Sequence, residues 1–195
     1  MMDDDAPYDI RICRESDGPV VDQKRLRDAV VRALRRAGRK RAHISIALVG
    51  DQRMAHLNEQ YLGHQGPTDV LSFDLSDVDG SDVDGEVVIS TDTAVRQAIR
   101  RGHDPTAEIL LYAIHGTLHL CGMNDGSEAD AGAMHRTEDE LLTEMGVGAV
   151  FGRPCEPGTR ATGTPDCPVA GASGSSRAPS LGAFARHRDL DDGDR

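Results

Sequence analysis

Two histidines and an aspartate occur at the spacing that a metal-binding helix and the turn after it require. His115 and His119 are four residues apart in the apolar stretch 109–121, and Asp125 follows ten residues after His115. Residues i and i+4 of an α-helix lie on one face about 6 Å apart, so both imidazoles can ligate one ion. Gly122 allows the chain to turn back after the helix and present Asp125 as a third ligand. Three protein ligands leave one coordination position for water, which is typical of catalytic zinc.

The same residues admit other interpretations. Two buried histidines can hydrogen-bond within a core without any metal, although the glycine and aspartate that follow them disfavour this. His135, on the next predicted helix, competes with Asp125 as the third ligand; we favour Asp125 because the turn returns it to the helix face. A small zinc peptidase of the metzincin type shares the skeleton HExxHxxGxxH, but Gly116 stands where its catalytic glutamate would lie.

The elements that must position these residues follow from apolar periodicity and capping signals. Strands are predicted over residues 8–13, 43–49, 69–75 and 86–90. Helices are predicted from Asp22 to Gly38 and over 52–61, 92–101, 106–121 and 128–145. The first strand–helix–strand unit favours parallel pairing, and a long hairpin joins the last two strands. The class is therefore α+β or α/β, with a small mixed sheet covered by helices.

Composition limits the class of protein further. The chain has 195 residues, is 28% charged and 38% hydrophobic, and carries a formal net charge of −11. Its longest apolar run, 109–114, is far shorter than the roughly 18 to 20 residues that span a bilayer. The acidic N-terminus does not resemble a signal peptide, so we expect no membrane association and a cytoplasmic protein. We expect residues 1–151 to form one folded domain and the Pro-, Gly- and Ser-rich residues 152–195 to form a disordered tail.

Positive charge is concentrated in one part of the chain. Nine of the 22 Lys and Arg residues fall between Asp22 and Arg41, on the first predicted helix and its C-terminal flank. This face can bind an RNA backbone or an acidic protein, although a charge run is most often only solvated. The strongly negative net charge disfavours a protein that coats nucleic acid, and we expect no DNA binding.

Three short motifs occur in an order that a known family shares. Residues 115–122 read HGTLHLCG, residues 57–61 and 67–73 read LNEQY and PTDVLSF, and residues 85–90 read GEVVIS. They resemble the HGxLHLxG, LNxxYR…PTDVLSF and GDIVIS motifs of the YbeY-type endoribonucleases, the ribosomal RNA maturation factors. The resemblance covers about residues 8–146. It implies an α+β fold with a four-stranded mixed sheet, about five helices and one Zn²⁺ per chain.

The resemblance also implies a function and a set of site residues. The function is zinc-dependent, single-strand-specific RNA hydrolysis in 3′-end maturation of 16S ribosomal RNA and in ribosome quality control, with the ribosome or its small subunit as partner. His115 and His119 match two metal ligands of the family, and Asp125 stands where the third histidine would be. Thr68 and Ser72 fall near the metal cleft, where their hydroxyls can contact RNA, although a structural role in the strand is equally open.

A second departure from the family weakens the prediction of cleavage. Leu62 stands where the family has an arginine, a residue that would bind phosphate or stabilise developing charge. The positive charge of the missing arginine would then have to come from Arg53, Arg96 or Arg136. The alternative is a ribosome-associated assembly factor that keeps the fold and the metal but cleaves weakly or not at all.

Overall fold

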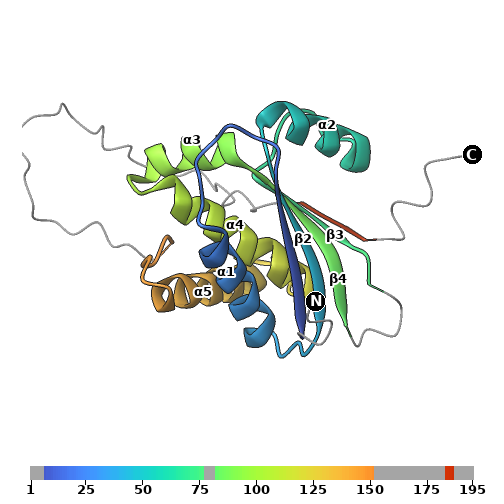
Figure 1. The fold of residues 1–195 in the computed structure, drawn as a ribbon, viewed down its shortest axis with the longest axis vertical. Coiled ribbons are helices and arrows are strands. Elements are labelled where there is room, and N and C mark those ends of the chain that lie inside the picture. Colours follow the sequence, from blue (N-terminus) through green and yellow to red (C-terminus); the bar gives the residue numbers. More distant parts are fainter. Residues whose placement is uncertain (1–6, 77–81, 152–182, 187–195) are drawn as a thin grey trace, which may run out of the picture.

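A mixed β-sheet lies at the centre of the protein, which was analysed as a computed structural model (Figure 1). The structure describes residues 7–76 and 82–151 and the backbone of residues 183–186. The strands are β1 (Tyr8–Arg14), β2 (Ala42–Val49), β3 (Val70–Asp74), β4 (Val83–Ser90) and β5 (Ala183–Arg186). The helices are α1 (Gln23–Arg36), α2 (Asp51–Leu62), α3 (Thr91–Arg101), α4 (Pro105–Leu120) and α5 (Glu128–Glu144). The predicted α+β class, with four strands and five helices, is confirmed.

The strands lie in the order β1-β2-β4-β3-β5. β1 pairs with β2, and β2 with β4, in parallel, whereas β3 and β4 form the predicted antiparallel hairpin. The fifth strand, β5, adds in parallel to the outer edge of β3 and was not predicted, because four residues are too few for a periodic signal. It belongs to the segment 152–195 that we predicted to be disordered; the rest of that segment lies outside the described residues.

Helix boundaries follow local capping chemistry. The Asp22 side chain accepts a hydrogen bond from the Lys24 amide at the start of α1, and Ser90 accepts one from Thr93 at the start of α3. Asp104 caps α4, and Pro105 occupies its first turn, where the missing amide hydrogen costs nothing. Among the helices within residues 7–76 and 82–151, none is both long and apolar enough to cross a bilayer.

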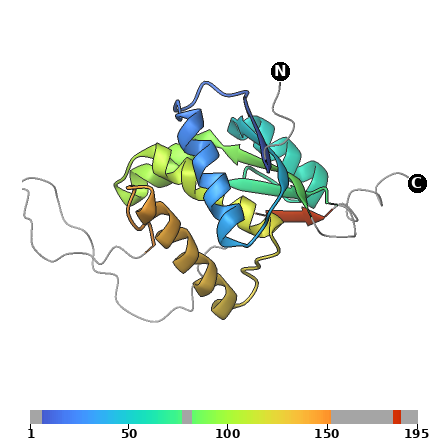
Figure 2. The same cartoon turned by 60° about the horizontal axis from the view of Figure 1, so that its bottom comes forward.

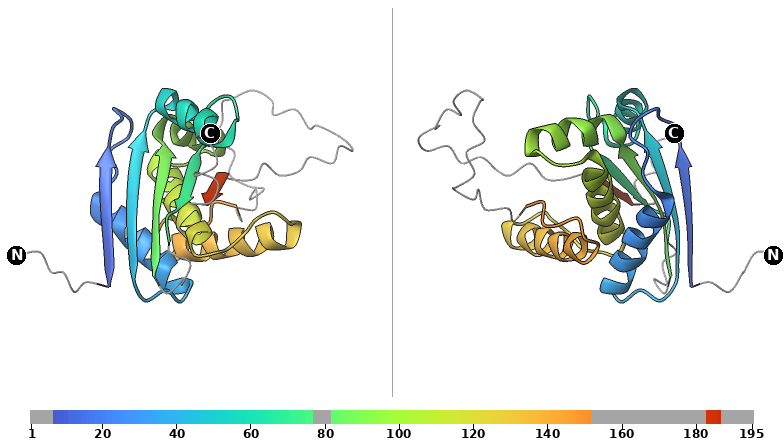
Figure 3. Two further views of the ribbon diagram at one scale, coloured as in Figure 1. Left: turned by 90° about the vertical axis from the view of Figure 1, so that its right-hand side faces the viewer. Right: turned by 60° about the vertical axis from the view of Figure 1, so that its left-hand side comes forward.

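Two apolar cores lie on opposite faces of the sheet. Figure 3 shows α1, α4 and α5 gathered on one side of the strands. There the large core joins alternate strand residues such as Ile46 and Val87 to the apolar stripes of these helices. The other face carries a small cluster, including Val49 and Phe73, which is covered at one end by α2. Because side chains alternate along a strand, a residue assigned to one core cannot reach the other.

Candidate metal centre

Helix α4 carries both histidines deep inside the protein. Every residue from Ala107 to Leu120 is buried, and His115 and His119 are only 1% and 6% exposed. The helix lies close to the sheet at Gly116, where an added Cβ would come within 2.6 Å of Val87 Cγ1. Helix–sheet packing therefore requires glycine at 116 and leaves no room for the glutamate that a metzincin-type peptidase would need.

The turn after α4 brings Asp125 back to the histidines. Gly122 has a φ of +93°, a left-handed conformation that favours glycine, and its amide donates to the His119 carbonyl at 2.8 Å. Asp125 Oδ1 then lies 3.8 Å from His119 Nε2, with its side chain 17% exposed. One ligand atom from each of His115, His119 and Asp125 lies within 4.8 Å of the others. The structure thus brings together the three predicted ligands.

The competing third ligand, His135, has a different environment. Its ring stacks on Phe151 with centroids 4.1 Å apart. Within the described residues, the group of side chains that can hold a metal contains Asp125 and not His135. The geometry therefore favours the carboxylate, as the turn chemistry indicated.

Both imidazole rings are fixed through the nitrogen that faces away from the centre. His115 Nδ1 lies 2.7 Å from Glu138 Oε1, and His119 Nδ1 lies 3.0 Å from the Met123 carbonyl. A carbonyl oxygen only accepts, so His119 Nδ1 carries the hydrogen and its Nε2 lone pair points inward. Metal-ligating histidines are typically oriented in this way by a carboxylate or carbonyl.

Glu138 is a candidate site residue that the sequence analysis missed. It is fully buried on α5, and its Oε2 has no hydrogen-bond partner among the described residues. A signal did exist, because Glu138 shares the buried stripe of α5 with Met134 and Leu141, where an apolar residue is the ordinary choice. Its partner could not be read from the sequence, since the contact depends on how α5 packs against α4.

The donor set fits a zinc ion. The two inward nitrogens, His115 Nε2 and His119 Nε2, are 2.9 Å apart. Zinc–nitrogen bonds of about 2.0–2.1 Å at the tetrahedral angle would separate two ligand nitrogens by about 3.3 Å, so a small ring movement suffices. Two neutral imidazoles and a carboxylate are ligands that zinc accepts, and three ligands leave a position for water or substrate.

The electrostatic environment favours positive charge at this position. Burial lowers the pKa of His115, but the hydrogen bond and negative charge of Glu138 outweigh burial, and the net pKa is raised. Burial, together with the neighbouring His115, lowers the pKa of His119. Asp69 and Asp125 also act on His115 in the raising direction. Carboxylates thus surround a pair of imidazoles that cannot both be protonated.

The residues of the PTDVLSF segment lie beside the centre in different ways. Asp69 Oδ1 accepts hydrogen bonds from the Val70 amide and the Thr68 hydroxyl, both at 3.0 Å. Asp69 therefore caps the start of β3. Its negative charge also contributes to raising the pKa of His115. Ser72 is 1% exposed, and its Oγ would lie 2.8 Å from a Cβ at Gly116. That burial favours a packing role for Ser72, whereas Thr68 is only partly buried.

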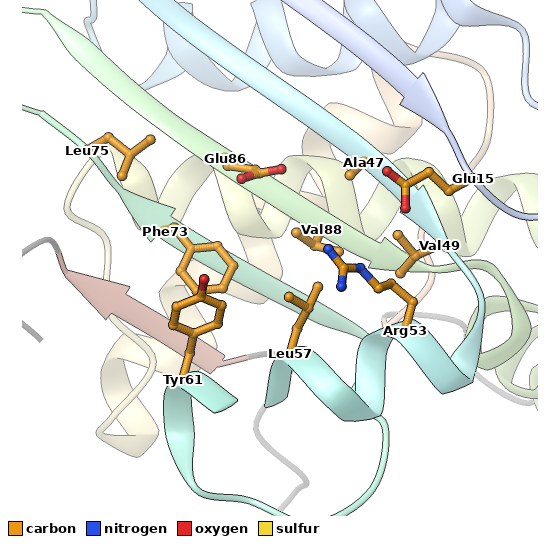
Figure 4. Close-up of a pocket in the computed structure, with 10 residues that line it drawn as sticks. All are labelled: Glu15, Ala47, Val49, Arg53, Leu57, Tyr61, Phe73, Leu75, Glu86 and Val88. Atoms are coloured by element: carbon orange, nitrogen blue, oxygen red, sulfur yellow. The ribbon is translucent and has the colours of Figure 1, made fainter. Parts of the chain in front are cut away.

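The position that departs from the family, Leu62, packs against the small core beside Leu57. Of the arginines considered as replacements, Arg96 forms an ion pair with Asp51. Arg53 lines a groove on the sheet face opposite α4, between Glu15 and Glu86 (Figure 4). Arg136 is exposed on α5. Neither Arg53 nor Arg96 therefore supplies a free guanidinium to the metal centre.

The fold and the site together define an α+β protein in which three side chains that could hold a metal ion, those of His115, His119 and Asp125, lie close together. The sequence model of the family described as "Endoribonuclease YbeY" matches residues 11–146. The chain therefore belongs to the YbeY family of endoribonucleases, and the resemblance found in its motifs is confirmed.

Individual relatives agree with this assignment. The protein named Endoribonuclease YbeY of Anaeromyxobacter sp. strain Fw109-5 is 42% identical over 167 residues, covering 84% of this chain and 85% of its own. That of Desulfitobacterium hafniense is 38% identical over 115 residues, covering 54% and 73%. The solution structure of TM1509 from Thermotoga maritima matches with a TM-score of 0.50 at 25% identity, over 77% of this chain and 99% of its own.

Proposed function

We propose that the protein is a zinc-dependent, single-strand-specific endoribonuclease that acts in 3′-end maturation of 16S ribosomal RNA and in ribosome quality control. It would work in the cytoplasm, on or near the small ribosomal subunit. One observation carries the proposal: the inward atoms of His115, His119 and Asp125 converge in a buried site whose rings are already oriented. Family membership supplies the expectation that the substrate is RNA.

Each residue has a distinct task in this proposal. His115, His119 and Asp125 would hold one zinc ion, which when bound supplies Lewis acidity toward water and a phosphate oxygen. Glu138 would hold the His115 ring in place, so that only a small movement is needed for its inward nitrogen to bind the ion. Thr68, which is partly buried, remains the proposed contact to RNA, while the buried Ser72 packs against α4 at Gly116.

The test measures metal content and cleavage on the same samples. We expect about one zinc per native chain by elemental analysis, together with cleavage of a single-stranded fragment of ribosomal RNA. Both should be lost in His115→Ala and kept in His43→Ala, because the His43 side chain is 64% exposed on β2. Circular dichroism of both variants checks that the fold is intact.

Two outcomes of this test would contradict different parts of the proposal. Absence of zinc from native protein purified without chelators would contradict the metal centre. Zinc without cleavage would contradict the nuclease and favour the second candidate function, an assembly factor that binds without cutting. The observation behind that alternative is that Leu62 packs against the small core and Arg53 lines a groove on the other sheet face, so neither position supplies a guanidinium to the metal ligands.

A further inference from the structure

Helix α1 presents two rows of basic side chains with different surroundings. The inner row, Arg32 and Arg36, faces α5 and pairs with Glu144 and Glu140. The outer row consists of Lys24, Arg27 and Arg35, which are exposed and have no charged or hydrogen-bonding side-chain partner within the described part of the chain. Figure 2 shows α5 beside α1 and the outer side of α1 open to solvent. Intramolecular pairing therefore accounts for the inner row but not for the outer row.

The segment that follows α1 contacts the C-terminal end of α4, next to the metal centre. After the helix the chain turns, and Arg39 Nη2 donates to the Cys121 carbonyl at 2.7 Å. Cys121 lies between the ligands His119 and Asp125. The Tyr8 hydroxyl in turn donates to the Arg39 carbonyl at 2.7 Å and fixes this connection. The outer row thus runs away from the metal centre along a rigid helix.

The outer row is also long enough to follow a nucleic-acid strand. Lys24 and Arg35 are eleven residues apart on one helix face, a distance of about 16 Å along the axis. The protein as a whole carries a net charge of −11, so a polyanion is repelled by most of its surface. The exposed cations of the outer row depart locally from this negative charge and offer a surface to which a polyanion can bind.

We infer that the outer row of α1 binds the phosphates of a single-stranded RNA whose cleaved segment lies at the metal centre. This inference rests on the proposed function for the identity of the polyanion. It assigns the path of the substrate: from the centre, past Arg39, and along α1 toward Lys24. Recognition on this path is through the backbone and does not depend on sequence.

The test compares two double variants with the same loss of charge. Arg27→Gln with Arg35→Gln removes part of the outer row, while Arg11→Gln with Arg100→Gln removes two exposed arginines from β1 and α3. Fluorescence anisotropy with the zinc-loaded proteins and a labelled, cleavage-resistant analogue of a single-stranded RNA of about 20 nucleotides gives the affinity at several salt concentrations. Loss of two phosphate contacts should weaken binding by about 10–30-fold near 0.1 M salt and reduce the salt slope by about 1.4. The control double variant should stay close to the native protein.

The outcomes separate this inference from the proposed function. Equal affinity of native protein and α1 variant, or an equal loss in the control, would overturn the RNA path. The RNA path would also be overturned if the α1 substitutions weakened the binding of poly-glutamate as much as the binding of RNA. That result would instead indicate an acidic protein partner. RNA binding that requires α1, in a protein that never cleaves with zinc, would uphold the path while refuting the nuclease.

Discussion

Replacing Glu138 with Gln is expected to weaken zinc binding by about 10–100-fold, because outer carboxylates that orient a ligating histidine have effects of this size. Gln keeps the shape and one hydrogen bond to His115 but removes the negative charge from a fully buried position. Competition with a chromophoric chelator measures the affinity directly, independently of catalysis. The matched control is Glu140→Gln, two residues further along α5 at an exposed site. Equal zinc affinity in the two variants would show that Glu138 has no role in binding.

At Glu86 the expected effect is on stability and depends on pH. Partial burial, then the charge of Glu15, raises the pKa of this carboxyl on the open face of the sheet. A raised folded-state pKa stabilises the protein below the unfolded-state pKa, and this contribution is lost as pH rises through the folded value. Glu86→Gln should therefore raise the melting temperature at pH 8 by a few °C relative to native protein, with the gain disappearing near pH 4. Asp84→Asn, at an exposed position on the same strand, should show no such trend.

Residues close together in sequence were the ones whose roles could be predicted. His115, His119 and Asp125 belong to one helix and its following turn, so helical geometry and one glycine suffice to bring them together. Glu138 belongs to a different helix, and its contact with His115 arises only when α5 packs across α4. Leu62 illustrates the same limit, since its contacts with the small core depend on which sheet face α2 covers.

Among the elements, α4 is the one whose position the site needs most, and Gly116 sets that position. Gly116→Ala should cost about 1–3 kcal/mol, as overpacking does in a close-packed core, because Val87 and Ser72 leave no space for a methyl group. The matched control is Gly132→Ala on α5, where the nearest atom is the flexible end of Arg136 at 3.4 Å. There alanine should be neutral or stabilising by up to about 1 kcal/mol. Urea unfolding measures both, and equal effects would mean that helix propensity rather than close approach governs position 116.

Element boundaries were predictable where capping or periodicity is local. Asp22, where the first helix was predicted to start, caps α1 and accepts a hydrogen bond from the Lys24 amide, and α4 begins at Pro105, one residue before its predicted start. β4 instead begins at Val83, three residues before the predicted start. Its first residues, Val83 to Gly85, include an aspartate and a glycine, and they are extended because they pair with Ala42 to Ile44 of β2. Pairing between distant strands thus overrides a sequence that reads as a loop.

At the scale of the whole molecule, the candidate metal centre includes a contact between two helices, α4 and α5, that are buried to different extents. α4 is surrounded by the large core, whereas on α5 only four residues are buried, including Glu138. A ligand that binds only the folded state stabilises those segments of the chain that must be folded for binding. Removing the metal should therefore loosen the turn 121–127 and α5 more than it affects α4 or the central strands.

Hydrogen exchange with and without EDTA measures this difference. We expect amide protection to fall about tenfold or more in residues 121–144 after chelation, since structural elements at the low-stability end open first. Protection in β2 and β4 should change little, because their hydrogen bonds lie inside a sheet that the metal does not touch. His115→Ala should show the loosened pattern in both conditions, which ties the effect to the centre rather than to the chelator. A uniform loss of protection across β2, β4 and α5 would contradict a local role and would mean that the metal holds the entire fold together.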